Sequence, residues 1–141
     1  MKIDKIFLDI DNVVADWTSF AAKTAGLDFD DLSVRLPFES QETISGLLNE
    51  NSLWKQIGDR GEMWWRQIPL LPWAIDLWTL CNRHASTIFL SSPFPGCDVS
   101  IDVVASAASG KIKWINQHFL TRKFLLGVHK ESCASFNALL I

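Results

Sequence analysis

Short apolar runs rich in strand-forming residues alternate along this chain with segments of helical pattern. Each run is too short for a stable helix, and the runs are residues 5–10, 87–90, 124–128 and 138–141. The helical segments are residues 16–25, 73–84 and parts of 98–108 and 110–119. Strands that alternate with helices predict an α/β fold whose parallel sheet is covered on both faces.

The chain has the size and composition of one domain. It has 141 residues, 48 % of them hydrophobic and 21 % charged, which is enough to bury a real core. We expect a Rossmann-like, three-layer core built from residues 1–15 and 68–141. Residues 16–67 carry polar clusters and scattered apolar positions, and we expect them to form a small helical cap inserted after the first strand.

Charge and composition exclude several classes of partner. A net charge of −3 offers no electrostatic basis for nucleic-acid binding. No uncharged apolar stretch approaches the ~20 residues of a membrane helix, and charges at positions 2, 4 and 5 argue against a signal peptide. Three cysteines without a Cys-x-x-Cys spacing fit idle thiols in a reducing compartment, so a cytoplasmic protein is expected.

Two aspartates, Asp9 and Asp11, directly follow the apolar core of the first strand. Residues two apart on an extended backbone point to the same side, about 6.6 Å apart along the strand. Carboxylates placed so closely at the end of a buried strand repel each other and lose hydration, a cost that a bound cation offsets. The alternative is structural, with one carboxylate capping the next helix and the other exposed.

Four further polar residues are candidates for the same site. Ser91 and Ser92 directly follow the second predicted strand. They either form a turn or present their hydroxyls at the carboxyl end of the strand, where parallel sheets bind ligands. Lys111 and Lys130 are either solvated surface charges or contacts to an anion. Asp16 is expected to cap the helix that it begins, and the three histidines, which lack metal-ligand spacing, are interpreted as structural.

These residues also resemble a known family. The segment DIDNVVAD at residues 9–16 resembles the first motif of the haloacid dehalogenase superfamily of phosphohydrolases. Its continuation VVADW, residues 13–17, is similar to the 5′-nucleotidase branch that includes the 5′(3′)-deoxyribonucleotidases. LSSP at 90–93 resembles the second motif, KIKW at 111–114 resembles the branch's Lys-x-x-Trp helix, and Lys130 falls where the third-motif lysine is expected.

Two positions depart from the family pattern. Asn12 replaces the usual glycine after the second aspartate, which is acceptable because asparagine also adopts left-handed backbone geometry. The sequence stops at Ile141, where the acidic pair of the fourth motif would begin. A truncated chain, a proteolysed product or a variant that has lost metal affinity is therefore expected. A last strand without a following helix is expected to favour a dimer or aggregation.

The resemblance implies a mechanism and a cofactor. Asp9 would attack the phosphorus of a phosphate monoester to give an aspartyl-phosphate. Asp11 would protonate the leaving oxygen and then deprotonate the attacking water. Mg²⁺ would be held by Asp9 and by the backbone carbonyl of Asp11.

The resemblance also assigns the groups that would hold the substrate. The phosphate-binding residues would be Ser91, Ser92 and Lys130, with Lys111 as a second lysine at a helix start. Trp17 and Phe38 are the aromatic side chains expected to contact the rest of the substrate.

Three functions follow as hypotheses. The leading one is a Mg²⁺-dependent phosphatase of 5′-nucleoside or deoxynucleoside monophosphates. The second is a receiver-like signalling domain that is phosphorylated on an aspartate, although such domains carry that residue after the third strand. The third is a chain with this fold and no activity, because the last metal carboxylates are missing.

Overall fold

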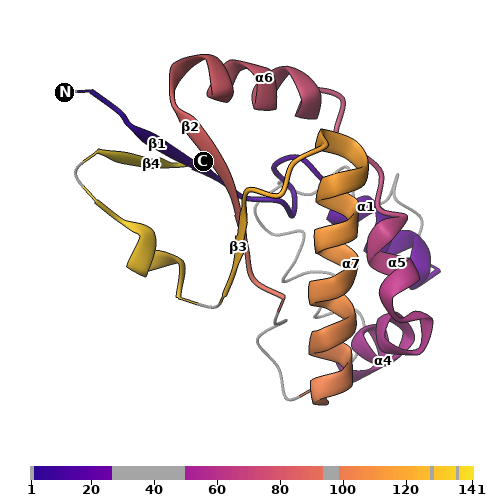
Figure 1. Ribbon diagram of the computed structural model, residues 1–141. Helices are drawn as coiled ribbons and strands as arrows, with labels where there is room; N and C mark the ends of the chain where they lie inside the picture. Colours follow the sequence, from indigo (N-terminus) through magenta and orange to yellow (C-terminus); the bar gives the residue numbers. More distant parts are fainter. Residues whose placement is uncertain (1, 27–49, 94–98, 128, 136) are drawn as a thin grey trace.

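Four short strands form a single parallel sheet in the computed structural model, which describes residues 2–26, 50–93, 99–127, 129–135 and 137–141 (Figure 1). The strands are β1 (Lys5–Leu8), β2 (Ser86–Ser91), β3 (Phe124–Leu126) and β4 (Ala138–Leu140). Their order across the sheet is β3-β2-β1-β4, and every neighbouring pair is parallel. All four apolar runs singled out in the sequence contain a strand, so the expected α/β fold with a parallel sheet is confirmed.

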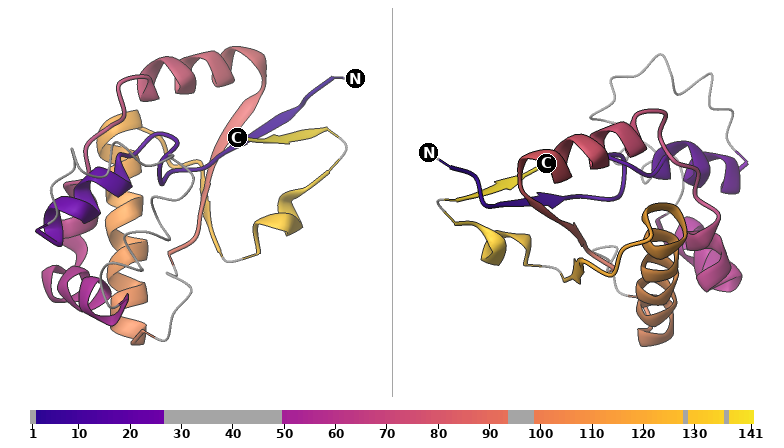
Figure 2. Two further views of the ribbon diagram at one scale, coloured as in Figure 1. Left: turned by 180° about the vertical axis from the view of Figure 1, so that it is seen from behind. Right: turned by 45° about the horizontal axis from the view of Figure 1, so that its top comes forward.

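Five α-helices and one short 3-10 helix accompany the sheet in the described part of the chain. They are α1 (Trp17–Thr24), α4 (Glu50–Arg60), α5 (Glu62–Arg66), α6 (Ala74–His84), α7 (Ile101–Phe119) and η1 (Lys130–Cys133). Helix α6 packs against β2, and α7 packs along α5. Helices α1, α4 and α5 gather on the side of α7 that faces away from β4 (Figures 1 and 2).

Helix α7 is continuous over 19 residues, so the prediction of two separate helices in this region is wrong. Gly110, the first residue of the second expected segment, is buried in the contact with α5. A Cβ at Gly110 would lie 2.5 Å from the Cβ of Trp65 and 2.8 Å from the carbonyl oxygen of Glu62. The glycine thus permits a close approach of two helices instead of ending one of them.

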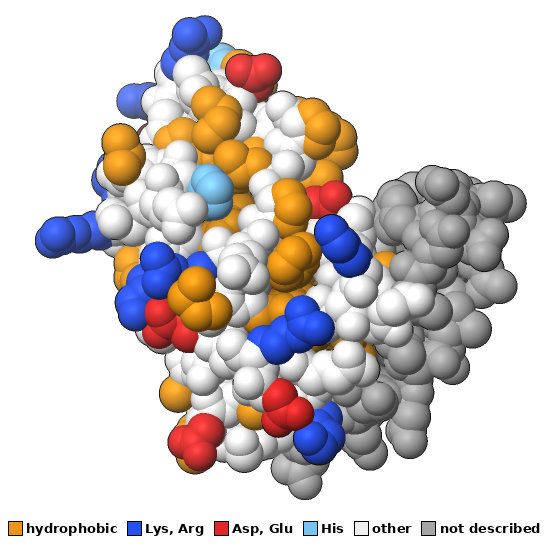
Figure 3. Space-filling view, turned by 90° about the vertical axis from the view of Figure 1, so that its right-hand side faces the viewer, with side chains coloured by type: hydrophobic (Ala, Val, Ile, Leu, Met, Phe, Trp, Pro, Cys, Tyr) orange, Lys and Arg blue, Asp and Glu red, His pale blue; other side chains and the backbone are white. Residues whose placement is uncertain are grey.

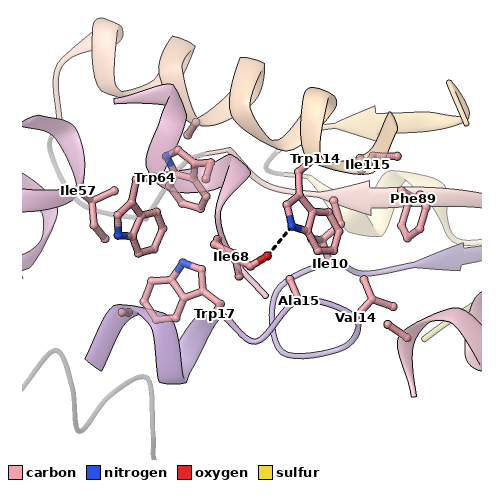
Figure 4. Close-up of a cluster of buried hydrophobic side chains, with 14 of the residues drawn as sticks. Ile10, Val14, Ala15, Trp17, Ile57, Trp64, Ile68, Phe89, Trp114 and Ile115 are labelled. Carbon is pink, nitrogen blue, oxygen red and sulfur yellow. Dashed lines mark hydrogen bonds between the residues drawn. The ribbon is translucent and has the colours of Figure 1, made fainter. Parts of the chain in front are cut away.

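One cluster of buried side chains connects the sheet to the helices (Figure 4). Its members include Leu8, Ile10, Phe89, Trp114 and Ile115 from residues 1–15 and 68–141, and Trp17, Ile57, Trp64 and Trp65 from residues 16–67. The indole nitrogen of Trp114 donates to the carbonyl oxygen of Ile68 at 2.7 Å. The described part of 16–67 therefore shares a core with the sheet, and its division into a separate cap stays a prediction.

Several large hydrophobic side chains stay exposed at the two edge strands. Leu125 on β3 is 47 % exposed, and Leu140 on β4 is 55 % exposed. Figure 3 shows a further face on which hydrophobic side chains lie between Lys and Arg side chains. The expected dimer stays a prediction. Among the described residues, no helix has the length and apolar character to cross a membrane.

Candidate active site

The polar residues singled out in the sequence lie at the ends of β1 and β2. Strand β1 ends at Leu8, directly before Asp9. Leu8 pairs in register with Phe89, which lies two residues before Ser91, the last residue of β2. Parallel neighbours end at the same edge of a sheet, so the segments carrying the aspartates and the serines leave it together. Two lysines from distant parts of the chain complete the group.

A tight turn follows β1 and contains Asp11. The amides of Val14 and Ala15 donate to the carbonyl oxygen of Ile10 at 3.0 Å and 2.9 Å. Asn12 has φ 60°, as expected from its replacement of glycine, and its side chain accepts from the amide of Thr18. The chain thus reverses directly beyond the strand and leads straight into α1.

Asp16 caps helix α1, as the sequence predicted. Its side chain accepts a hydrogen bond from the amide of Ser19 at 3.2 Å. An aspartate at this position satisfies an amide that has no partner within the helix. Neither Asp9 nor Asp11 is therefore needed to cap α1, so the alternative in which one of these two carboxylates serves as the helix cap no longer applies.

Asp11 is held by a buried lysine. The ammonium of Lys111 lies 2.5 Å from Oδ2 of Asp11 and donates to Oγ of Ser91 and to the carbonyl oxygen of Ser92, each at 2.9 Å. Lys111 is only 3 % exposed, and Ser91 only 1 %. An ammonium has three donors, and all three are engaged here. Lys111 therefore ties the ends of β1 and β2 to α7.

The position of Lys111 differs from the sequence prediction. It was expected at a helix start, as a second phosphate contact, but it lies in the middle of α7. Because its three donors already have acceptors and its side chain is buried, it supports Asp11 and Ser91 and offers no donor to a ligand in this structure. The ring of Trp65, 4.9 Å from the ammonium, adds a cation–π contact from α5.

Asp9 forms a second and more accessible ion pair. Its Oδ2 contacts the ammonium of Lys130 from η1, and its Oδ1 accepts from the amide of Ile10 at 2.8 Å. The side chains of Asp9 and Lys130 are 27 % and 29 % exposed. A ligand can thus approach Asp9 and Lys130 from solvent.

One predicted substrate contact, Trp17, does not join this group. Trp17 is 5 % exposed and packs against Trp54 and Trp64 at ring distances of 6.0 Å and 6.4 Å, so the structure gives it a role in the core. The reason is that the apolar face of α1 turns inward, toward α4 and α5. Phe38 lies outside the described residues.

The donor set fits a hard cation in kind. Asp9 and Asp11 supply carboxylate oxygens, and Mg²⁺ is often held by one or two carboxylates, with water and phosphate oxygens filling the remaining positions. Oδ1 of Asp11 is buried and has no hydrogen-bond partner among the described residues, which leaves it able to accept a cation or a proton. In the same part of the chain, no group of three or more His, Cys, Asp or Glu side chains could hold a metal ion.

The formal charges of the site cancel. Two aspartates face two lysines, so a cation meets little net attraction before an anion arrives. The same balance holds for a phosphate that arrives without a cation. This arrangement suits a cation and a phosphate that bind together.

No protein-family model matches this chain, and no curated protein matches it.

Sequence reasoning missed two residues that shape the site, Trp65 and Gly110. Trp65 was not among the aromatic side chains expected to contact the substrate, yet its ring covers the ammonium of Lys111. Gly110, next to Lys111, lets α5 approach closely enough for that contact. Neither role has a local sequence signal, because each depends on the packing of two helices far apart in the chain.

Proposed function

We propose that this chain is a Mg²⁺-dependent phosphatase of phosphate monoesters that uses Asp9 as nucleophile. One observation carries the proposal: polar residues far apart in sequence gather in two groups just beyond the ends of β1 and β2, Lys111 with Asp11 and Ser91, and Lys130 with Asp9. Taking charged groups out of water costs free energy, which makes the buried Lys111 group a candidate for a functional site.

The proposed fold is a Rossmann-like sheet with residues 16–67 as a cap. The strand order β3-β2-β1-β4 is that of the first four strands of a doubly wound sheet, which supports this interpretation. In such sheets, ligands bind beyond the carboxyl ends of the strands, where the order reverses. Trp65 on α5 would bring the cap into contact with the site through Lys111.

Asp9 is the proposed nucleophile because it is the more accessible aspartate. Its carboxylate oxygen would form a bond to phosphorus while the bond from phosphorus to the leaving alcohol oxygen breaks, which gives an aspartyl-phosphate. Lys130, which contacts Asp9, would then hold an oxygen of the transferring phosphoryl group. Ser91 and the next residue in sequence, the half-buried Ser92, would supply hydroxyl donors.

Asp11 is the proposed acid and base. Lys111 holds Oδ2, so the unpartnered Oδ1 is the atom on which we place the transferable proton. That proton would pass to the leaving oxygen, and the next would come from the water that attacks the phosphorus of the aspartyl-phosphate. The products are an alcohol, inorganic phosphate and the original two aspartates.

Mg²⁺, which would be held by Asp9 and by the backbone carbonyl of Asp11, would neutralise negative charge on the phosphoryl group. The proposed substrates are 5′-nucleoside or deoxynucleoside monophosphates. This choice depends on the sequence resemblance of residues 9–17, since Trp17 is buried and Phe38 lies outside the described residues.

The proposal is tested by trapping the phosphorylated residue. The chain is mixed with a panel of 5′-nucleoside monophosphates or with acetyl phosphate, quenched in acid, and mapped by mass spectrometry. A phosphoryl group on Asp9 that forms and disappears as substrate turns over is the expected result. A phosphoryl group on any other residue would overturn the assignment of Asp9.

The same experiment separates the alternatives. A stable phosphoryl group on Asp9 without release of phosphate would favour a receiver-like domain. No phosphorylation and no phosphate release, from a chain whose fold is intact by circular dichroism, would favour a protein with this fold and no catalytic activity.

A further inference from the structure

A cavity lies away from Asp9, on the surface of α7. It has a volume of about 540 Å³ and is lined by one face of α7, by the last residue of α5 and by the connection from α7 into β3. The β3 residue in its wall is Phe124, at the amino end of that strand, whereas Asp9 lies beyond the carboxyl end of β1. The cavity shares no lining residue with the candidate active site. We call it the α7 pocket.

The charged side chains that line the α7 pocket are all cations. They are Arg66, Lys113 and Arg122. Glu62, which is not part of the lining, lies 2.6 Å from Lys113 and 3.8 Å from Arg66, so three positive charges face one negative charge. Nε of Arg66 is buried and has no hydrogen-bond partner in the described part of the chain. This excess of cations and the unused donor favour a ligand with more than one negative charge.

The rest of the lining fits a flat organic group. Asn116, Gln117 and Thr121 offer amide and hydroxyl groups, which can donate and accept hydrogen bonds. Phe124 and Ile112 add apolar surface, and an aromatic ring can stack on a nucleobase. The volume lies within the range of roughly 300–1,000 Å³ that is usual for small-molecule sites.

We propose that the α7 pocket binds a nucleoside polyphosphate. Its phosphates contact Arg66, Lys113 and Arg122, and its base lies against Phe124. This site is separate from the one proposed for phosphate monoesters and does not depend on the phosphatase function. Occupation of the pocket would join α5, α7 and β3, and two of these elements, α5 and α7, also carry Trp65 and Lys111.

Binding is measured by isothermal titration calorimetry with a non-hydrolysable ATP analogue and with inorganic triphosphate. The key variant is Arg122→Gln, because Arg122 is exposed and its removal should not disturb the fold. We expect the affinity for the analogue to fall about tenfold or more, the effect of losing one charge-assisted contact. The matched control is Arg83→Gln on α6, which should bind like the wild type.

The Asp9→Asn variant separates this site from the active site, and it should bind the analogue with unchanged affinity. The proposal is wrong if binding is undetectable at millimolar analogue, if Arg83→Gln weakens it as much as Arg122→Gln, or if Asp9→Asn abolishes it. Inorganic triphosphate that binds as tightly as the analogue would overturn the assignment of a base to Phe124.

Discussion

Lys111 and Asp11 are joined by an ion pair whose Nζ and Oδ2 atoms lie 2.5 Å apart, although the two residues are one hundred positions apart in sequence. The same ammonium reaches Ser91, so one buried lysine links α7 to the ends of β1 and β2. Asp9 and Lys130 form a separate and more exposed pair. The two pairs should therefore respond differently to substitution.

Replacing Lys111 with methionine should destabilise the fold by about 2–3 kcal/mol. The change leaves the Asp11 carboxylate and the Ser91 hydroxyl without their partner in a largely buried site. We expect a smaller loss of unfolding free energy than for breaking a fully buried ion pair, because the side chain of Asp11 is 23 % exposed. Urea unfolding provides the measurement, and Lys113→Met, which breaks an exposed pair with Glu62, is the control and should change stability little.

The double variant Lys111→Met with Asp11→Asn should recover part of that loss, because no uncompensated charge remains. A single variant Lys111→Met that unfolds within about 0.5 kcal/mol of the wild type would contradict the structural role assigned to this lysine.

Replacing Lys130 with methionine should affect phosphate release strongly and stability only weakly. Both partners of the Asp9–Lys130 pair are partly solvated, so stability should change by less than about 1 kcal/mol. Phosphate release should fall by about a hundredfold, because a donor to the transferring phosphoryl group is lost. Steady-state kinetics and urea unfolding on the same preparation test both parts. Wild-type turnover in this variant would remove Lys130 from the site.

Gly110→Ala should destabilise the protein by about 1–3 kcal/mol, because the new methyl group overlaps Trp65 and the Glu62 carbonyl of α5. The higher helix propensity of alanine offsets only about 1 kcal/mol. Gly127→Ala is a matched control, since a Cβ there meets no atom within 4 Å. Thermal unfolding of both variants gives the comparison, and equal melting temperatures would show that α5 does not approach α7 so closely.

Stability should decrease as the pH falls through the range in which His118 titrates. Burial lowers the pKa of His118 below its ordinary value of 6.5, because the charged imidazolium loses hydration. The unfolded chain therefore binds a proton that the folded chain does not, and this penalty begins as the pH drops below 6.5. Glu62 has a pKa lowered from 4.5 by Lys113 and Ser109, so it titrates in more acidic solution.

Urea unfolding at about pH 7.5 and about pH 5.5 isolates the histidine contribution. The loss of stability between the two values should be smaller in His118→Gln than in the wild type. An identical loss in both proteins would mean that other groups produce it.

The sequence predicted the strands well because their apolar runs are short and are bounded by polar residues. The run that contains β1, followed by Asp9 and Asp11, also indicated where the site would lie. The strand ends bring Ser91 to the same edge because parallel neighbours end together. Asp16 as a helix cap and Asn12 in a left-handed turn were predictable from local chemistry alone.

Other features depend on contacts between distant segments and could not be predicted. Gly110 lies at the start of the second helical segment expected from the sequence, whereas in the fold it lies in the middle of α7 and faces Trp65. Lys111 resembles a surface charge until α5 covers it. Trp17 was available for a ligand by sequence, but the fold buries it against Trp54 and Trp64. In each case, tertiary packing decides whether a side chain faces solvent.

The most direct measurement of the central claim is phosphate release from 5′-nucleoside monophosphates by the wild type and by Asp9→Asn, each with Mg²⁺ and with a chelator. Asp9→Asn preserves the size of the side chain but removes the nucleophile. The account predicts release only by the wild type with Mg²⁺, and a rate below about one thousandth of it in the variant. Equal rates in the two proteins, or a wild type that releases no phosphate under any condition, would contradict it.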